Sequence, residues 1–192
     1  MGIAADAQQA TLYLWEFLML VWLAGMFMTR RTVRQQTSSS RFWQTGIMLF
    51  GAWLLFVGGT GDAWLDAVAL PVTAGVALTG MAITAAGVAF AIWARLTLGT
   101  NWSGIITIKE GHTLVRRGAY RLVRHPIYTG LLISLVGTAL TRGTVHSFLA
   151  LPICVFGFWL KSVTEEQFML QQFGHDYLNY QRQVRGLVPF LF

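Results

Sequence analysis

Residues 126–160 read PIYTGLLISLVGTALTRGTVHSFLALPICVFGFWL, and this stretch decides how the chain folds. Two apolar runs, 126–140 and 145–160, flank the short polar segment 141–144. Each run is somewhat shorter than the roughly 20 residues that a helix needs to cross a bilayer core. We therefore predict a tight helical hairpin embedded in a membrane, and leave open whether it crosses the bilayer fully.

Three longer apolar runs precede this hairpin, at residues 11–28, 42–60 and 68–94. The chain of 192 residues is 55% apolar and only 11% charged, whereas a soluble domain carries about 25% charged residues. We predict an all-α polytopic membrane protein with five transmembrane helices, forming one domain over residues 1–192. Three of the spans lie in residues 1–94. The hairpin and a cytoplasmic C-terminal helical region that binds a cofactor lie in residues 95–192. The first ten residues carry no basic charge, so we expect no cleavable signal peptide.

The basic residues indicate the orientation of the five predicted spans. Of 14 Lys and Arg residues, 13 lie in the segments 29–41, 95–125 and 161–192, which fall on one side of the membrane. Arg142 lies on the other side with Asp6, Asp62 and Asp66. The positive-inside rule then places the N-terminus outside and the C-terminus in the cytoplasm, and we expect a prokaryotic cell membrane. Contacts of these residues with anionic lipid headgroups explain the net charge of +6 without a nucleic acid partner.

Small residues at helical spacing predict close packing between two of the spans. They are Gly80, Thr84, Gly87 and Ala91 in one span, and Gly130, Ser134 and Gly137 in another. Cys154 lies in an apolar run and is predicted to be a packing residue. Glu16 is the one carboxylate inside a predicted span, and it either reaches the membrane surface or has a functional role.

The polar residues that could carry chemistry lie in two blocks on the same side, 95–130 and 161–192. A transporter would place ionisable groups near mid-membrane, so this arrangement favours an enzyme that joins a soluble cofactor to a lipid-borne substrate. In the first block, Pro126 suits the first turn of a helix, with His125 as its cap and the helix N-terminus open to a bound group.

In the second block, Glu165 either pairs with Lys161 four residues before it or, with Glu166, neutralises a cationic ligand. Gly174 predicts a helix break. The residues Tyr177 and Tyr180 share one face of the next helix, as packing residues or as a cofactor wall.

Taken together, these residues resemble the isoprenylcysteine carboxyl methyltransferase family, within a wider group that includes phospholipid methyltransferases. The resemblance covers residues 98–192 and rests on His112 to Val115, Gly118, Tyr120, Arg124, His125, Pro126, Tyr128, Gly130, Glu165, Glu166, Phe173, Gly174, Tyr177, Tyr180 and Pro189. It implies an integral membrane methyltransferase that uses S-adenosylmethionine. The acceptor it implies is lipophilic and bilayer-borne, a small molecule or a prenylated substrate, with a carboxylate as the methylated group.

The resemblance also implies the site residues. The cofactor-binding residues are His112, Thr113, Leu114, Val115, Tyr120, His125, Pro126, Ile127, Tyr128 and Glu165, and the catalytic residues are Lys161, Arg124 and Glu166. No metal is expected, and the element from Leu98 to Trp102 is recognised without a specific role. Lys161 stands where eukaryotic members have an Arg, and Gln183 replaces a basic residue. Both departures weaken the case for a prenylcysteine carboxylate as acceptor.

Alternative functions stay open. A phospholipid or amine N-methyltransferase would need a base, for which Glu166 or His125 is available. The chain is also similar to NADPH-dependent sterol reductases, but these carry an acid after the motif glycine, where this chain has Leu131. A non-catalytic lipid-binding membrane protein is the third class. The sequence leaves the identity of the acceptor and the oligomeric state undetermined.

Overall fold

A computed structural model describes residues 2–26, 32–35, 38–58, 61–102, 107–109 and 113–187. The helices in these ranges are α1 (Ile3–Met26), α2 (Ser38–Phe56), α3 (Ala74–Leu98), α4 (Pro126–Arg142), α5 (Val145–Phe173) and α6 (His175–Gln183). Two short 3₁₀ turns, Gly99–Asn101 and Gly118–Arg121, lie between α3 and α4. The prediction of an α-helical membrane protein is therefore confirmed.

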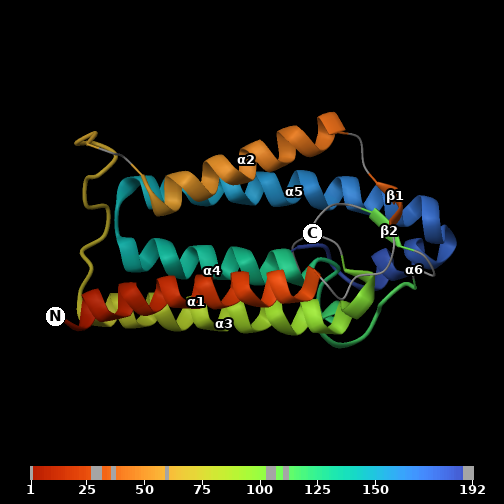
Figure 1. Ribbon diagram of the computed structural model, residues 1–192, viewed down its shortest axis with the longest axis horizontal. Helices are drawn as coiled ribbons and strands as arrows, with labels where there is room; N and C mark the ends of the chain where they lie inside the picture. Colours follow the sequence, from red (N-terminus) through yellow and green to blue (C-terminus); the bar gives the residue numbers. More distant parts are fainter. Residues whose placement is uncertain are drawn as a thin grey trace.

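The five long helices run alternately in opposite directions along one axis (Figure 1). Helix α2 lies beside α5, and α1 lies beside α3 and α4. An apolar core that includes Leu55, Leu135, Ala150 and Phe158 joins the two groups, and Cys154 is buried in it, as predicted. One end of the bundle carries the N-terminus and the α4–α5 turn, and the other carries α6 (Figure 1).

The predicted stripes of small residues form the contact between α3 and α4. A Cβ atom added to Gly80 would lie 2.6 Å from the carbonyl oxygen of Gly137, and one added to Gly130 would lie 2.7 Å from the backbone nitrogen of Ala91. Across the same contact, Thr84 Oγ1 donates a hydrogen bond to the carbonyl of Ser134 at 3.3 Å. The two backbones are thus close enough that any added side chain would collide.

Three helices in the described residues are long and apolar enough to cross a membrane: Ile3–Met26, Val145–Phe173, and α3 with its following 3₁₀ turn, Ala74–Asn101. Helix α4, with 17 residues, is shorter than the roughly 20 residues of a full span. Helix α2, with 19 residues, is not among the three either. The prediction of five spans is therefore not confirmed and stays a prediction, although α2 and α4 run beside the longer helices.

Two features of the α6 end differ from the elements expected from the sequence. The strands β1 (Thr32–Gln35) and β2 (Thr107–Lys109) form an antiparallel pair, in which two connecting segments satisfy each other's backbone groups. Helix α5 continues from Val145 through the second polar block to Phe173, well past the predicted end of its apolar run. The break at Gly174 is confirmed, since this residue has a φ of 49° and separates α5 from α6.

Candidate active site

A cavity of about 230 Å³ lies at the α6 end of the bundle and takes part of its wall from each of the six helices. Ten predicted site residues line it: Thr113, Leu114, Val115, Tyr120, Arg124, His125, Ile127, Tyr128, Lys161 and Glu165. Pro126 is buried at the start of α4, and Glu166 contacts the cavity residues Arg124 and His125. His112 lies outside the described residues.

The start of α4 has the predicted form and is held by the C-terminal segment. Helix α4 begins at Pro126, with His125 as its N-cap residue. The backbone N–H of Arg124 donates to the carbonyl of Arg185 at 2.7 Å, and that of His125 donates to the carbonyl of Gly186 at 3.2 Å. A segment about 60 residues away in sequence therefore fixes the backbone that presents these two side chains.

The two adjacent carboxylates have different partners because neighbouring residues on a helix point about 100° apart. Glu165 lines the cavity with a side chain that is 30% exposed, and its Oε2 accepts a hydrogen bond of 2.7 Å from the hydroxyl of Tyr128. Glu166 instead accepts from Arg124 Nε at 2.8 Å and from Gln181 Nε2 at 2.7 Å. Glu165 is thus available to a ligand, while Glu166 stabilises the wall.

Arg124 is engaged by the protein itself. Besides Glu166, its guanidinium donates through Nη1 to the carbonyls of Val184 at 2.5 Å and Gln181 at 3.3 Å. These bonds join the segment before α4 to α5 and to the end of α6. The contacts favour a positioning role for Arg124 over a role in holding an anionic acceptor.

His125 is 6% exposed and lies between the two carboxylates. Its Nε2 is 3.0 Å from Glu166 Oε1, and its Nδ1 is 3.6 Å from Glu165 Oε2. Burial of the ring by itself lowers its pKa, but hydrogen bonds to Glu165 and Glu166 and their negative charges outweigh it and raise the pKa of His125 above its ordinary value. The imidazolium form is therefore stabilised in the folded protein.

This shift predicts a pH dependence of stability. A raised pKa in the folded state stabilises the protein fully below the unfolded-state pKa of about 6.5, and this stabilisation is lost as the pH rises through the folded-state value. We expect the thermal unfolding midpoint in detergent to fall over this window, and the His125→Asn variant to lack that step. Parallel pH profiles of the two proteins would contradict this expectation.

Aromatic rings form much of the remaining wall. The rings of His125 and Tyr128 stack with a centroid distance of 5.5 Å and an interplanar angle of 5°, and Lys161 Nζ lies 5.4 Å from the centroid of Tyr128. Tyr177 and Tyr180 are both buried and both line the cavity, so they combine the packing and wall roles considered from the sequence. The hydroxyl of Tyr180 also donates to the carbonyl of Tyr120 at 2.6 Å.

Sequence reasoning missed several lining residues. They are Trp22, Met48, Leu131, Phe158 and Met169, together with Leu98, Asn101 and Trp102 from the recognised element that had no assigned role. Trp22, Met48, Leu131 and Phe158 sit within long apolar helices, where the sequence does not distinguish a residue that faces a cavity from one that faces lipid. Asn101 could have been identified from the sequence because it is a polar residue shortly after an apolar run. Its Nδ2 donates to Thr113 Oγ1 at 3.2 Å.

Comparisons with known proteins agree with this arrangement. The phospholipid methyltransferase family profile matches residues 76–176, just over half of the chain. The chain is 33% identical over 119 residues to a probable protein-S-isoprenylcysteine O-methyltransferase of Oryza sativa subsp. indica. That alignment covers 60% of this chain and 62% of the rice protein. The chain is also 39% identical over 101 residues to protein-S-isoprenylcysteine O-methyltransferase A of Arabidopsis thaliana, in an alignment that covers 51% of each protein. The chain thus spans about half to three fifths of these relatives.

A solved structure shows the same fold. It is that of the eukaryotic intramembrane Ras methyltransferase, isoprenylcysteine carboxyl methyltransferase, with a TM-score of 0.53 and 21% sequence identity. The superposition covers 81% of this chain and 55% of the other.

Proposed function

Because this chain belongs to the phospholipid methyltransferase family, we propose that it transfers a methyl group from S-adenosylmethionine to a lipophilic acceptor. The observation that carries the proposal is the cavity at the α6 end, where residues from both polar blocks lie together around Glu165. The relatives named above are isoprenylcysteine O-methyltransferases, which supports a carboxylate as the acceptor group.

The lining residues fit this cofactor. Glu165 presents a partly exposed carboxylate that suits the ammonium of the methionyl group, and its bond to Tyr128 fixes its orientation. The faces of Tyr128 and Tyr120 suit a positively charged sulfonium, because aromatic rings attract cations. When bound, the cofactor supplies an electrophilic methyl group. The protein aligns the reactants and excludes water from between them.

We assign the acceptor to the other part of the cavity. Trp22, Met48, Leu131 and Phe158 come from four different helices and give this part an apolar wall. We propose that the apolar chain of the acceptor enters here from the bilayer. Lys161, which also lines the cavity, would orient an anionic group near the aromatic wall.

The state of His125 favours a carboxylate over an amine as acceptor. An amine must lose a proton during methyl transfer, so an N-methyltransferase needs a base. Hydrogen bonds to its two carboxylate neighbours and their charges raise the pKa of His125, which favours the protonated ring, and Glu166 is occupied by Arg124 and Gln181. A carboxylate acceptor needs no base. The sterol-reductase alternative is weakened because Leu131, an apolar residue, lines the cavity where an acid would be expected.

The topology proposed for this function has five spans, with the cavity at the cytoplasmic end. The helices alternate in direction (Figure 1), and 13 of the 14 basic residues lie in the segments 29–41, 95–125 and 161–192, which this topology assigns to the cytoplasmic side. Reporter fusions at the two chain ends test this orientation. An N-terminus and a C-terminus on the same side would contradict it.

The proposed cofactor is tested by ligand-induced stabilisation. We expect S-adenosylmethionine and its demethylated product to raise the unfolding midpoint of the detergent-purified protein, and NADPH to leave it unchanged. The Glu165→Gln variant should weaken this binding by about tenfold or more, because a charged hydrogen bond to the ammonium is lost.

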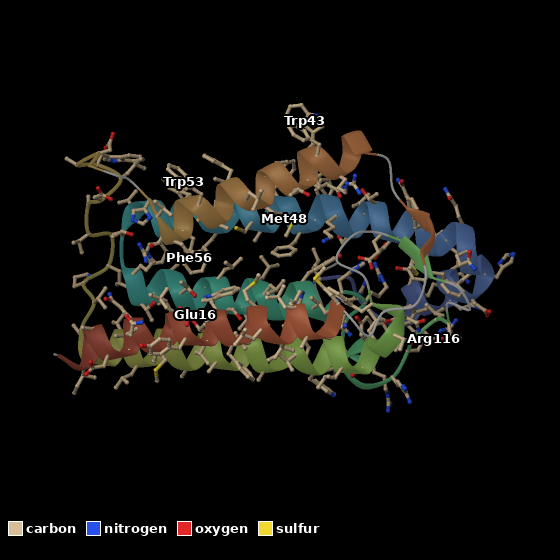
Figure 2. The ribbon with its side chains drawn as sticks, in the orientation of Figure 1. Glu16, Trp43, Met48, Trp53, Phe56 and Arg116 are labelled. Atoms are coloured by element: carbon tan, nitrogen blue, oxygen red, sulfur yellow. The ribbon has the colours of Figure 1, made fainter. Side chains whose placement is uncertain are left out.

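The control for this test is Glu16→Gln, the same chemical change at an exposed position on α1 (Figure 2). Stabilisation by NADPH alone would favour the reductase reading, and no response to any of the three compounds would favour a non-catalytic protein. If Glu165→Gln bound S-adenosylmethionine as tightly as the wild type does, Glu165 would not be a cofactor-binding residue.

A separate variant tests the role of Lys161. Lys161→Arg keeps the positive charge but replaces a compact ammonium with a planar fork that binds carboxylates in a bidentate manner. We expect KM for an isoprenylcysteine carboxylate substrate to change several-fold while the affinity for S-adenosylmethionine stays within about twofold. A change of equal size in both constants would show that Lys161 does not act on the acceptor.

A further inference from the structure

A second cavity lies at the opposite end of the bundle, where α1 begins and α4 ends. It has a volume of about 470 Å³, and its wall includes Asp6, Gln8, Gln9, Thr138, Thr141 and Arg142. It shares no lining residue with the candidate active site. It is therefore separate from the candidate active site.

Arg142 is the residue of this cavity whose bonding is incomplete. Its Nε is buried, and among the described residues no acceptor lies within hydrogen-bond distance of it. A buried donor without an acceptor is costly, and guanidinium groups bind phosphate and carboxylate oxygens strongly. The neighbouring polar groups are already partly satisfied, since Gln8 donates to the carbonyl of Thr141 at 2.6 Å. Nε itself is closed to solvent, but Arg142 lines the cavity, and among the described residues its guanidinium makes no ion pair. An anionic oxygen of a ligand would therefore bind its terminal Nη groups.

Asp6 gives the cavity a negative charge as well. In the part of the chain that the structure describes, neither Asp6 nor Arg142 takes part in an ion pair. Both line the same cavity, so a bound group with separated positive and negative charges would complement both. A simple anion would satisfy Arg142 but be repelled by Asp6. A phosphate linked to an ammonium matches the pair.

The surroundings point to a lipid as the source of this group. Leu12 lines the cavity and is 37% exposed, and the next residue, Tyr13, is also exposed. Exposed Trp64 lies in the connection that is tied to the start of α5, where the N–H of His146 donates to the carbonyl of Leu65. Trp residues are enriched at the level of lipid headgroups, and Trp64 lies in a connection at this end of the bundle. A headgroup in the cavity would therefore have its acyl chains beside the apolar surface of α1.

We infer that this cavity binds the headgroup of a zwitterionic phospholipid with a primary ammonium, its phosphate on Arg142 and its ammonium on Asp6. The site lies on the leaflet opposite the candidate active site, and it does not depend on the proposed methyl transfer. It would secure the start of α1 to the end of α4 through a bound lipid.

Lipid titrations of the delipidated full-length protein in detergent test this site. We expect dioleoyl phosphatidylethanolamine to raise the unfolding midpoint at lower concentrations than dioleoyl phosphatidylcholine, which cannot donate a hydrogen bond to Asp6, and dioleoyl phosphatidylglycerol to act most weakly. Arg142→Gln should weaken the phosphatidylethanolamine effect by about tenfold or more. Asp6→Asn should abolish the preference for phosphatidylethanolamine over phosphatidylglycerol.

The matched control is Arg121→Gln, the same change at an exposed position at the other end of the protein, which should bind lipid as the wild type does. Arg142→Lys, which keeps the charge without the fork, should bind with intermediate affinity. Equal stabilisation by phosphatidylglycerol in the wild type, or an unaltered response in both Arg142 variants, would overturn the assignment. If soluble glycerophosphoethanolamine saturated the site at the same concentration as the lipid, the acyl chains would add nothing, and the ligand would not be a membrane lipid.

Discussion

Replacing Glu166 with alanine is expected to lower the free energy of unfolding by about 3 kcal/mol, because it leaves the Arg124 guanidinium and the His125 ring at the cavity wall without their partner. Glu166 accepts from Arg124 at 2.8 Å and lies 3.0 Å from His125. The side chains of Arg124 and His125 are largely buried, at 13% and 5% exposed. Water can therefore replace the lost carboxylate only in part.

The same variant should also loosen the C-terminal segment. Arg124 holds the carbonyls of Gln181 and Val184, and Glu166 holds the side chain of Gln181, so the carboxylate links α5, the start of α4 and the end of α6. We expect faster amide hydrogen exchange in residues 181–187 and weaker binding of S-adenosylmethionine. This combination separates a positioning role from a direct contact with the cofactor.

Glu166→Gln provides the matched comparison. The amide keeps the shape and can still accept from Arg124, so it should lose less stability than the alanine variant. Asp176→Asn is the control, since the Asp176 carboxylate is 79% exposed and lies 3.9 Å from Arg116. Such exposed pairs contribute little to stability. If Glu166→Ala unfolded at the same midpoint as Asp176→Asn, the network would have no structural role.

The sequence predicts those features of this protein that local chemistry decides. The His125–Pro126 pair predicts where α4 begins, since proline suits the first helical turn, and Gly174 predicts where α5 ends, with a positive φ that glycine adopts readily. The small residues of α3 and α4 predict a close contact because the membrane offers helices little other means of specific association. Each of these predictions depends on a few neighbouring residues.

Features that depend on distant parts of the chain are not predictable in this way. Nothing in the residues around Gly186 shows that its carbonyl binds the N–H of His125, a contact that arises only when α6 turns back toward α4. Trp22 and Met48 reach the cavity from α1 and α2, but in sequence they look like the lipid-facing residues around them. The short strand pair likewise joins two segments more than 70 residues apart.

The division of roles between the two glutamates lies between these cases. From the sequence, both carboxylates could neutralise one cationic ligand, but adjacent side chains on a helix point about 100° apart, and in the structure they have different roles. Which of them faces the cavity depends on how α5 is rotated against α4, and that rotation follows from packing of residues such as Tyr128 against Phe158, whose ring centroids are 5.2 Å apart. The resemblance favoured Glu165, and Glu165 is the one that lines the cavity.

Replacing Gly87 with alanine should destabilise the bundle by about 3 kcal/mol, although alanine is the better helix former. The added Cβ would lie 2.5 Å from the carbonyl oxygen of Gly130 and 2.5 Å from the backbone nitrogen of Ser134. Backbone atoms cannot rotate away as a side chain can, so α3 and α4 must separate. Overpacking in a rigid contact costs about 1–3 kcal/mol. The hydrogen bond from Ser134 to the carbonyl of Thr84, 3.3 Å long, would lengthen as well.

Gly46→Ala is the matched control, because a Cβ at Gly46, an exposed position on α2, would meet no atom within 4 Å. There the same change should leave stability unaltered or raise it by up to about 1 kcal/mol through helix propensity. Unfolding midpoints of the two variants in one detergent measure the difference, which isolates the helix contact from the propensity of alanine. Separation of α3 from α4 would also displace Tyr128 and Leu131 in the cavity wall, so Gly87→Ala should weaken S-adenosylmethionine binding, while Gly46→Ala should not. Equal midpoints would mean that α3 and α4 are not held at the backbone distance seen here.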